Sequence, residues 1–289
     1  MYYLKNLYIT EELLNDKKAH DFKDDMRKSF HVYVLPDRIE AFRQELTDIK
    51  DYDKESLLMS SVPELLNFAR AIGVASIPCV NNDFDNYVGY EFALQDFAET
   101  QADYIDKSYR RLKDIPWEVI ETKRMIIREE TVEDLPALYK LYEGEHIKRF
   151  IEPLLPDIRA EEEYVEKYKK YVYRMYEFGI WIAEEKDTHE LIGRMGLEPK
   201  TYEDDVKGVE LGYIIGEKFL RQGYCMEGCR AIIDYARDAL NLPELYVIIK
   251  PANEVSQIIA EKLGFIYEKD INDRNRIMKR YKIAFNEQI

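Results

Sequence analysis

The chain has 289 residues, 46% of them hydrophobic and 34% charged, and its formal net charge is −15. This composition is typical of a folded globular protein, and the length is sufficient for two domains. The acidic excess argues against nucleic acid as a partner. No apolar run is long enough to span a bilayer, and the N-terminus lacks a signal-peptide pattern. The three cysteines, Cys79, Cys225 and Cys229, predict neither a disulfide framework nor a metal site, so we expect a cytoplasmic protein.

Short apolar runs alternate with amphipathic stretches in the first 120 residues. Helices are expected where Asp37 can cap residues 36–49, where Pro63 precedes residues 64–72 and Gly73 stops them, and over 102–112. Strands are expected at 7–9, 31–35, 57–59 and 75–80, with a further one at 87–94. Because strands alternate with helices, this half predicts a parallel α/β layer. We place the domains at 1–120 and 121–289.

Three segments of the first half resemble a haloacid-dehalogenase-like, Rossmann-like domain: MSSVP from Met59, ARAIG from Ala69 and SIP from Ser76. Working members carry an Asp-x-Asp nucleophile motif after the first strand and a later acidic motif. Here the first strand ends in ITEE from Ile9, and a serine pair from Ser60 occupies the later position. Phosphoryl transfer needs a carboxylate nucleophile and Mg²⁺ ligands. The resemblance therefore implies an inactive accessory domain that serves binding or dimerisation, and it disfavours a Mg²⁺-dependent phosphatase.

The second half begins with a predicted strand at 123–129. Thr131 and Asp134 then predict a helix start, and that helix runs to about Tyr142. A long helix is expected at 161–178, followed by a hairpin of strands 179–183 and 191–197. The apolar run at 211–215 predicts a buried strand, and the last strand is expected at 277–283.

A polar turn follows the strand at 211–215, and Gly223, Tyr224 and Cys225 open a long amphipathic helix. A strand, a glycine-containing loop and a helix N-terminus together form an anion site, because unpaired N–H groups and the positive end of the helix dipole converge there. The loop lacks both the Gly-Lys-Ser/Thr of a P-loop and the G-x-G-x-x-G of a dinucleotide fold.

The loop LRQGYC, from Leu220 to Cys225, resembles the acyl-CoA pyrophosphate loop of GNAT (Gcn5-related) N-acetyltransferases, Gln/Arg-x-x-Gly-x-Gly/Ala. Leu220 departs from that pattern. Three flanking segments resemble the branch that acetylates ribosomal-protein N-termini: ELGY from Glu210, NEVS from Asn253 and EKLGF from Glu261. The resemblance covers the chain from about Lys123 onward. It implies a mixed, mostly antiparallel sheet with flanking helices, so the whole chain is expected to be α/β.

The resemblance also implies acetyl-CoA as co-substrate, without a metal. The pyrophosphate would contact the main chain of six consecutive residues: Arg221, Gln222, Gly223, Tyr224, Cys225 and Met226. Tyr224 could instead fill the core. By position, Ile215 would offer its N–H to the acetyl oxygen, although a buried strand isoleucine fits equally. Asn253 would hold the chain near the pantetheine arm, and it also suits a helix N-cap.

Acetyl transfer requires a neutral amine, and an amine with a pKa near ~10 is mostly protonated at neutral pH. Glu210 is the candidate general base; the other interpretation is a strand glutamate that faces solvent or pairs with a lysine. Glu198 is the second choice. The family often places a tyrosine acid four positions before the glycine of the Leu-Gly-Phe motif, and here that position is Ala260. Ser256 is the expected substitute as proton donor.

The leading hypothesis is an acetyl-CoA-dependent N-acetyltransferase that acts on a primary amine of a small molecule or peptide. The acceptor pocket is expected at the loop 143–159, where Glu143, Glu145 and Glu152 could attract a cation and His146 is the only histidine. A lone loop histidine is more often structural than catalytic. The alternative is a non-catalytic acyl-CoA-binding regulatory protein, which the departures at Leu220 and Ala260 favour. Homodimerisation through sheet edges is a further expectation.

Overall fold

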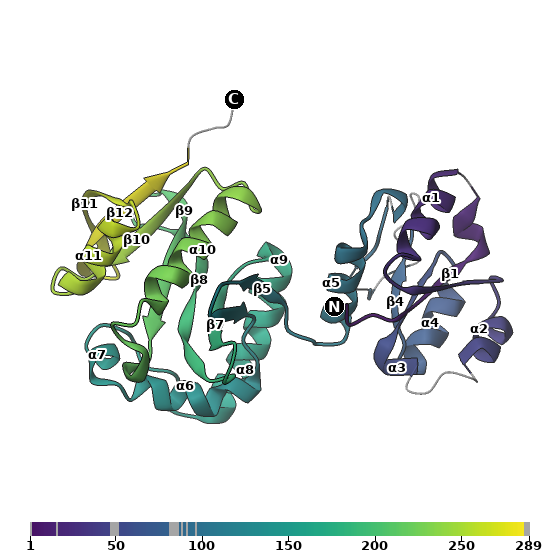
Figure 1. Cartoon of the computed structure of the whole chain (residues 1–289), viewed down its shortest axis with the longest axis horizontal. Coiled ribbons are helices and arrows are strands. Elements are labelled where there is room, and N and C mark those ends of the chain that lie inside the picture. The colour runs from purple at the N-terminus through teal and green to yellow at the C-terminus, as the bar shows by residue number, and fades with distance from the viewer. Residues whose placement is uncertain are drawn as a thin grey trace. The chain divides into compact units, whose positions relative to one another are not determined.

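The computed structural model describes residues 2–15, 17–46, 52–80, 87, 89–90, 92–95 and 97–285. The chain forms two compact units, Met1–Ile115 and Pro116–Ile289, and the domain bounds 1–120 and 121–289 stay a prediction (Figure 1). Each unit is described by itself. Among the described helices, none combines the length and the apolar character that crossing a membrane requires.

The first unit is a parallel four-stranded sheet between helices, as predicted. Its strands, in the spatial order β2-β1-β3-β4, are β1 (Asn6–Thr10), β2 (His31–Leu35), β3 (Ser56–Ser60) and β4 (Ala75–Pro78). The helices are η1 (Glu11–Leu14), α1 (Lys17–Met26), α2 (Ile39–Leu46), α3 (Tyr52–Glu55), α4 (Pro63–Ala71), η3 (Phe97–Glu99) and α5 (Ala102–Leu112). Two apolar clusters cover the two faces of this sheet. Its kinship to haloacid-dehalogenase-like domains stays a prediction.

Two predictions in this unit are corrected within the described residues. The strand expected at 87–94 is reduced to one bridge, between Leu94 and Cys79. Asp37 does not cap the next helix, because that helix begins only at Ile39 and the Asp37 Oδ2 accepts the Glu12 N–H at 3.2 Å instead. The end expected for this helix, residue 49, lies outside the described residues.

The second unit is built on an eight-stranded mixed sheet in the order β11-β12-β10-β9-β8-β7-β6-β5. The strands are β5 (Glu118–Glu121), β6 (Met125–Arg128), β7 (Ile180–Glu185), β8 (Leu191–Thr201), β9 (Lys207–Ile215), β10 (Glu244–Ile249), β11 (Ile266–Asp273) and β12 (Arg276–Ala284). Every neighbouring pair is antiparallel except β9 and β10. The predicted hairpin is confirmed as β7 and β8. The edge strands β5 and β11 were not expected, because their residues alternate weakly and are mostly exposed.

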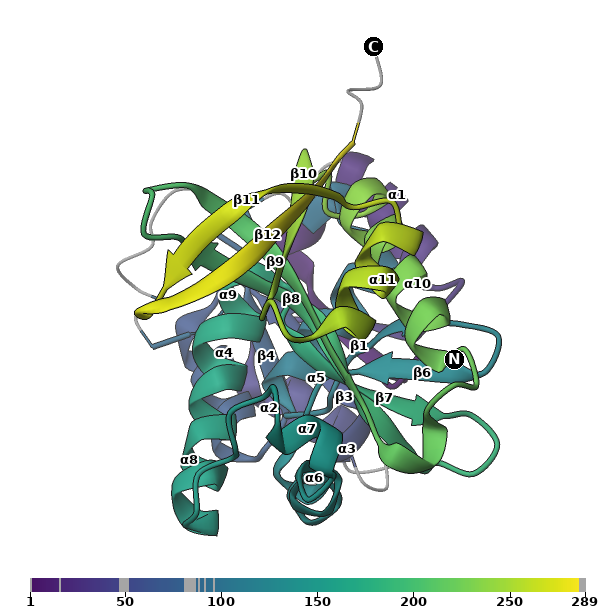
Figure 2. The same cartoon turned by 90° about the vertical axis from the view of Figure 1, so that its left-hand side faces the viewer.

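Helices cover both faces of this sheet (Figure 2). They are η4 (Val132–Asp134), α6 (Leu135–Tyr142), α7 (Glu145–Lys148), α8 (Ile158–Tyr168), η5 (Lys169–Tyr173), α9 (Arg174–Tyr176), η6 (Glu217–Phe219), α10 (Tyr224–Asp238) and α11 (Glu254–Lys262). Helices α10 and α11 pack into the main core on one face, and α6 and α8 lie on the opposite face.

The helix expected at 161–178 is interrupted, because η5 is a π-helical turn. Two tyrosines account for the interruption. The Tyr168 hydroxyl accepts the Ile180 N–H at 2.9 Å, and the Tyr173 hydroxyl donates to the Ile180 carbonyl. A regular α-helix would turn two side chains five positions apart in different directions, whereas the wider turn lets both reach the start of β7.

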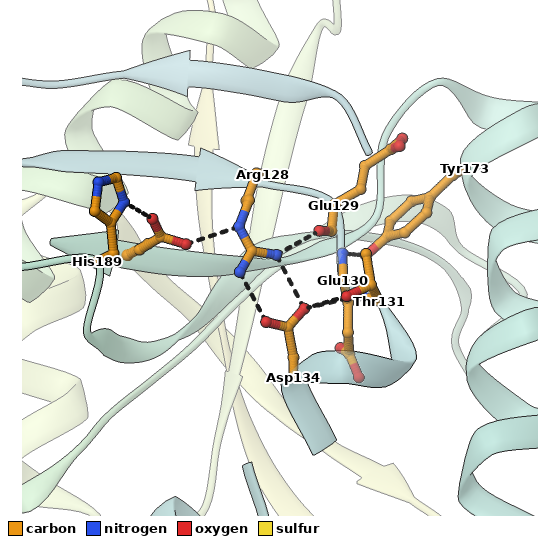
Figure 3. A network of polar contacts seen from close by, with 8 residues as sticks. Arg128, Glu129, Glu130, Thr131, Asp134, Tyr173 and His189 are labelled. Carbon is orange, nitrogen blue, oxygen red and sulfur yellow. Dashed lines mark hydrogen bonds and ion pairs between the residues drawn. The ribbon is translucent and has the colours of Figure 1, made fainter. Parts of the chain in front are cut away.

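An arginine fork fixes α6 against the sheet (Figure 3). The Arg128 guanidinium donates to both carboxylate oxygens of Asp134, at 2.7 and 2.9 Å, and to Glu184 on β7 at 2.9 Å. Asp134 also accepts the N–H of Thr131 at 2.8 Å, so the predicted capping box is confirmed. Glu184 in turn contacts His189 at 2.6 Å. These bidentate, charge-assisted bonds set the position from which the next helices start.

Strands β9 and β10 are joined at one place only, where Tyr246 is the partner of Glu210. Beyond Glu210 the two strands diverge. The run at 211–215 was expected to be buried throughout, but only Leu211 and Ile215 are. The residues between them are half-buried, because β10 no longer lies beside β9 at this point.

Two glycines opposite each other in the sheet offer a matched stability test. A Cβ at Gly196 would lie 2.1 Å from the Gly179 carbonyl oxygen, whereas a Cβ at Gly212 would meet only the flexible end of Ile180 at 3.4 Å. Gly196→Ala must therefore displace backbone, and we expect it to lower the free energy of unfolding by about 1–3 kcal/mol. Gly212→Ala should stay within about 0.5 kcal/mol.

The measurement is urea unfolding followed by tryptophan fluorescence. Both tryptophans, Trp117 and Trp181, belong to the second unit, so the signal reports on that unit. Equal stability of the two variants would contradict the close backbone approach at Gly196.

Candidate functional site

The loop before α10 ends in a left-handed glycine. Gly223 is the N-cap of α10 with φ 86°, a conformation that a side chain disfavours. Three residues before Tyr224 are exposed, and Arg221 also has positive φ, at 60°. The N-terminus of this 15-residue helix therefore lies next to exposed residues, and Gly223 at the N-cap has no Cβ that would obstruct a ligand. Such a terminus favours an anion.

Arg124 reaches this loop from the start of β6, and the sequence analysis missed it. Its guanidinium donates to the Gln222 carbonyl at 3.0 Å and lies 4.1 Å from the centre of the Tyr224 ring. It is paired with Glu227 on α10 at 2.7 Å. The sequence gives no spacing that connects Arg124 to a loop about a hundred residues later, so only the fold could reveal this contact.

The residues predicted to contact phosphate differ in their exposure and in their side-chain contacts. Tyr224 is buried, its ring packs against Phe219, and its hydroxyl donates to Glu185 at 2.5 Å, which supports the core-filling interpretation. The Gln222 side chain turns back to the Lys218 carbonyl at 2.7 Å. Arg221 is exposed, and Cys225 and Met226 are half-buried. The backbone of the loop, rather than these side chains, is what the structure offers to a ligand.

The backbone of Ile215 faces the opening between β9 and β10. The Gly216 N–H donates to the Ile192 carbonyl at 2.8 Å, and Gly193 is the register partner of Ile215. Because bonded and non-bonded pairs alternate in an antiparallel ladder, the Ile215 N–H and carbonyl point away from β8. His146 from α7 lies 2.9 Å from that carbonyl through its Nε2.

Glu210 stands where the opening begins. Its register partner on β8 is Glu198, and Lys200 lies 3.2 Å away as an ion pair. Burial raises the pKa of Glu210 to about 7; Lys200 opposes this shift, and Glu198 and Asp273 add to it. The side chain therefore pairs with a lysine, and a carboxyl of this pKa could take up a proton near neutral pH, so the role of Glu210 as the base stays a prediction.

The start of α11 borders the other side of the opening. Asn253 Oδ1 accepts the Ser256 N–H at 3.2 Å, so Asn253 is the helix N-cap. Ala260 is completely buried. The Tyr213 hydroxyl, from β9, donates to the Ser256 carbonyl at 3.3 Å, and burial raises the pKa of Tyr213. Tyr213 was not singled out from the sequence, although it belongs to the ELGY segment.

The expected acceptor loop reaches the tip of the β11–β12 hairpin. Glu152 lies 3.3 Å from Arg276 and 3.9 Å from Arg274 in exposed ion pairs. Asp273, in the same tip, contributes to the raised pKa of Glu210. Loop and hairpin therefore meet on the side of the sheet where Glu210 lies. Within the described residues, no group of three or more histidine, cysteine or carboxylate side chains could hold a metal ion.

Known proteins are similar to this part of the chain. Residues 124–266 match the model of the acetyltransferase (GNAT) domain family. The Bacillus subtilis uncharacterized protein YkkB is 33% identical over 37% of this chain and 62% of its own length, so this chain spans less than two thirds of it. The B. subtilis uncharacterized N-acetyltransferase YoaA is 27% identical over 51% of this chain and 82% of its own length.

A solved structure gives the same fold. The "putative ribosomal-protein-serine acetyltransferase" of Vibrio cholerae superposes with a TM-score of 0.50 and 19% identity, covering 58% of this chain and 97% of that chain. At this identity the likeness shows the fold alone.

Glu210 predicts a pH-dependent stability. The folded carboxyl keeps its proton up to about pH 7, whereas an unfolded glutamate releases it near ~4.3. The unfolding free energy therefore falls as pH rises through this window. Glu210→Gln has no carboxyl to titrate, so its free energy of unfolding should not show this decline. Between pH 5 and pH 8, the unfolding free energy of the variant should rise relative to that of the wild type by on the order of 1–3 kcal/mol.

Urea unfolding at several pH values measures this difference. Glu203→Gln is the matched control, because Glu203 is exposed in the turn between the same two strands. An identical pH dependence in all three proteins would contradict the buried, raised-pKa state of Glu210.

Proposed function

We propose that the GNAT acetyltransferase domain formed by residues 124–266 transfers an acetyl group from acetyl-CoA to a primary amine of a small molecule or peptide. The observation that carries this proposal is the divergence of β9 and β10 immediately after Glu210. The opening has a carboxyl of pKa about 7 where it begins and the free N-terminus of α10 beyond its other end. The acceptor amine requires a base such as this carboxyl, and the phosphates of CoA require an anion site such as the helix N-terminus. The thioester would lie in the opening between these two features.

The backbone would hold acetyl-CoA. The pyrophosphate fits the N–H groups of residues 221–226, where Gly223 permits close approach. The Ile215 N–H, which points into the opening, would donate to the thioester carbonyl and stabilise the charge that develops on its oxygen. Asn253 would line the pantetheine arm from the start of α11 while it caps that helix.

Glu210 would receive the proton of the acceptor ammonium. Glu210 and Ile215 lie five residues apart on β9, roughly 16 Å along the strand, so the proton would travel through water. Gly212 lies between them and carries no side chain that would crowd the amine. The neutral amine attacks the thioester carbon, the C–N bond forms, the C–S bond breaks, and the thiolate leaves. The nitrogen then gives up a second proton, and this proton balances the one that the thiolate takes up. Ser256 is our candidate donor to the thiolate and would regain its proton through water, and the neighbouring Tyr213 hydroxyl is the second candidate.

The alternative proposal is a non-catalytic acyl-CoA-binding protein. One observation favours it, because the position at which the family often carries a tyrosine acid is Ala260, enclosed in the core. For the first unit we propose a binding or dimerisation role. The carboxyl ends of β1 and β3 meet there in a Thr10–Ser60 hydroxyl contact of 3.2 Å, in place of the acidic groups of a phosphatase.

The pyrophosphate loop can be tested by substitution of Gly223. In Gly223→Val the side chain would strain the left-handed backbone and enter the space toward Arg124, 3.5 Å from the new Cβ. We expect the affinity for CoA to fall at least a hundredfold, while the melting temperature changes by only a few degrees because the loop is exposed. Calorimetric titration with CoA, acetyl-CoA and ATP measures this effect. Unchanged CoA binding would remove the loop assignment.

The role of Glu210 can be tested by the pH dependence of turnover in a screen of amines. The wild-type rate should rise with pH through about 7, because Glu210 must be deprotonated to act as a base. Glu210→Gln should lose about 10²–10⁴-fold at or below pH 7. The loss should shrink toward pH 10 as the free amine becomes abundant.

The exposed Glu203→Gln again serves as the control. If Glu210→Gln showed the same pH dependence of turnover as the wild type, Glu210 would be excluded as the base. Tight acetyl-CoA binding with no transfer to any amine would favour the non-catalytic alternative.

A further inference from the structure

His146 makes a contact that the proposed reaction has not yet used. It comes from α7, a single helical turn, and its Nε2 lies 2.9 Å from the Ile215 carbonyl oxygen. Because a carbonyl only accepts hydrogen bonds, Nε2 must carry the proton in this contact. The imidazole is therefore a donor here, and this nitrogen is not available to act as a base.

The Ile215 carbonyl would otherwise lack a partner in the sheet. It points away from β8, and β10 has already diverged after Glu210. A carbonyl of a buried residue is costly without a donor, and a donor from outside the sheet removes that cost. His146 thus takes the place that the missing strand would have occupied.

Space for the imidazole comes from the glycine at the start of α7. A Cβ at Gly144 would lie 3.2 Å from the His146 ring and 3.3 Å from the Leu141 carbonyl. Gly144 has φ −60°, which any residue can adopt. Glycine matters at this position because it has no side chain. Even alanine at this position would press on the ring.

We propose that His146 is a positioning residue for acetyl transfer, which holds the backbone of Ile215 so that the Ile215 N–H points at the thioester carbonyl. In a strand, the N–H and carbonyl of one residue point to the same side. A clamp on the carbonyl therefore fixes the direction of the N–H. This inference rests on the proposed function, because it concerns the group that would hold the acetyl oxygen.

The test is the carbonyl stretch of [1-¹³C]acetyl-CoA bound to the full-length protein, recorded by difference infrared spectroscopy. A hydrogen bond to the thioester carbonyl lowers its frequency, and this readout needs no acceptor amine. His146→Leu keeps apolar volume but has no donor, whereas His146→Gln can keep an N–H near the Nε2 position. Gly144→Ala keeps the histidine and displaces its ring.

We expect the wild type and His146→Gln to show the lowered frequency, His146→Leu to lose most of the shift, and Gly144→Ala to lie between them. The affinity for CoA should stay within about twofold in all variants, because the phosphate loop is untouched. Turnover of His146→Leu should fall about tenfold with an unchanged KM for acetyl-CoA, less than the ~10²–10³ that loss of a whole oxyanion donor costs.

Two results would overturn this inference and leave the proposed function intact. The first is the same carbonyl frequency in the wild type and His146→Leu. The second is a lost frequency shift in His146→Leu together with weakened CoA binding and a lowered melting temperature, which would show a purely structural role. A wild type that binds neither acetyl-CoA nor CoA would instead defeat the proposed function, and this inference with it.

Discussion

The single connection between β9 and β10 is the constraint on which the rest of the second unit depends. A sheet that stayed paired beyond Glu210 would use every backbone group of β9 and leave no opening. Divergence leaves the N–H and carbonyl of Ile215 facing the opening, and the protein tolerates this because His146 satisfies the carbonyl from outside the sheet. The same divergence places Glu210 at the edge of the opening, where partial burial makes a carboxyl of pKa about 7.

A rigid frame on the face of α6 and α8 keeps this opening in place. Arg128 joins β6, β7 and α6, and Arg194 on β8 pairs with the buried Glu130 at 2.8 Å. Buried ion pairs add little net stability compared with apolar packing, but they accept few alternative arrangements. Tyr168 and Tyr173 complete the frame by holding the start of β7, at the expense of a regular helix. The polar contacts on this face therefore specify geometry more than they supply stability.

Features that depend on residues close together in the chain could be predicted from the sequence. The capping box of Thr131 and Asp134 and the start of α10 at Gly223 are local, since a few adjacent residues decide them. The contacts of Arg124 with Glu227 and of His146 with Ile215 join segments that are far apart in the chain, and no periodicity signals them. The π-helical turn was missed for the same reason, because its cause is the backbone of Ile180 on a later strand.

The pairing of Arg124 with Glu227 affects how a phosphorylated ligand would approach. Arg124, which reaches the loop from β6, is already paired with Glu227, and the whole chain carries a net charge of −15. At long range, then, the molecule repels a polyanion, while the attraction of the α10 terminus acts only over about one helical turn. Added salt screens the long-range repulsion more than the short-range attraction. Ionic strength should therefore accelerate the encounter, and the rate of escape should depend on how well the ligand fits the loop.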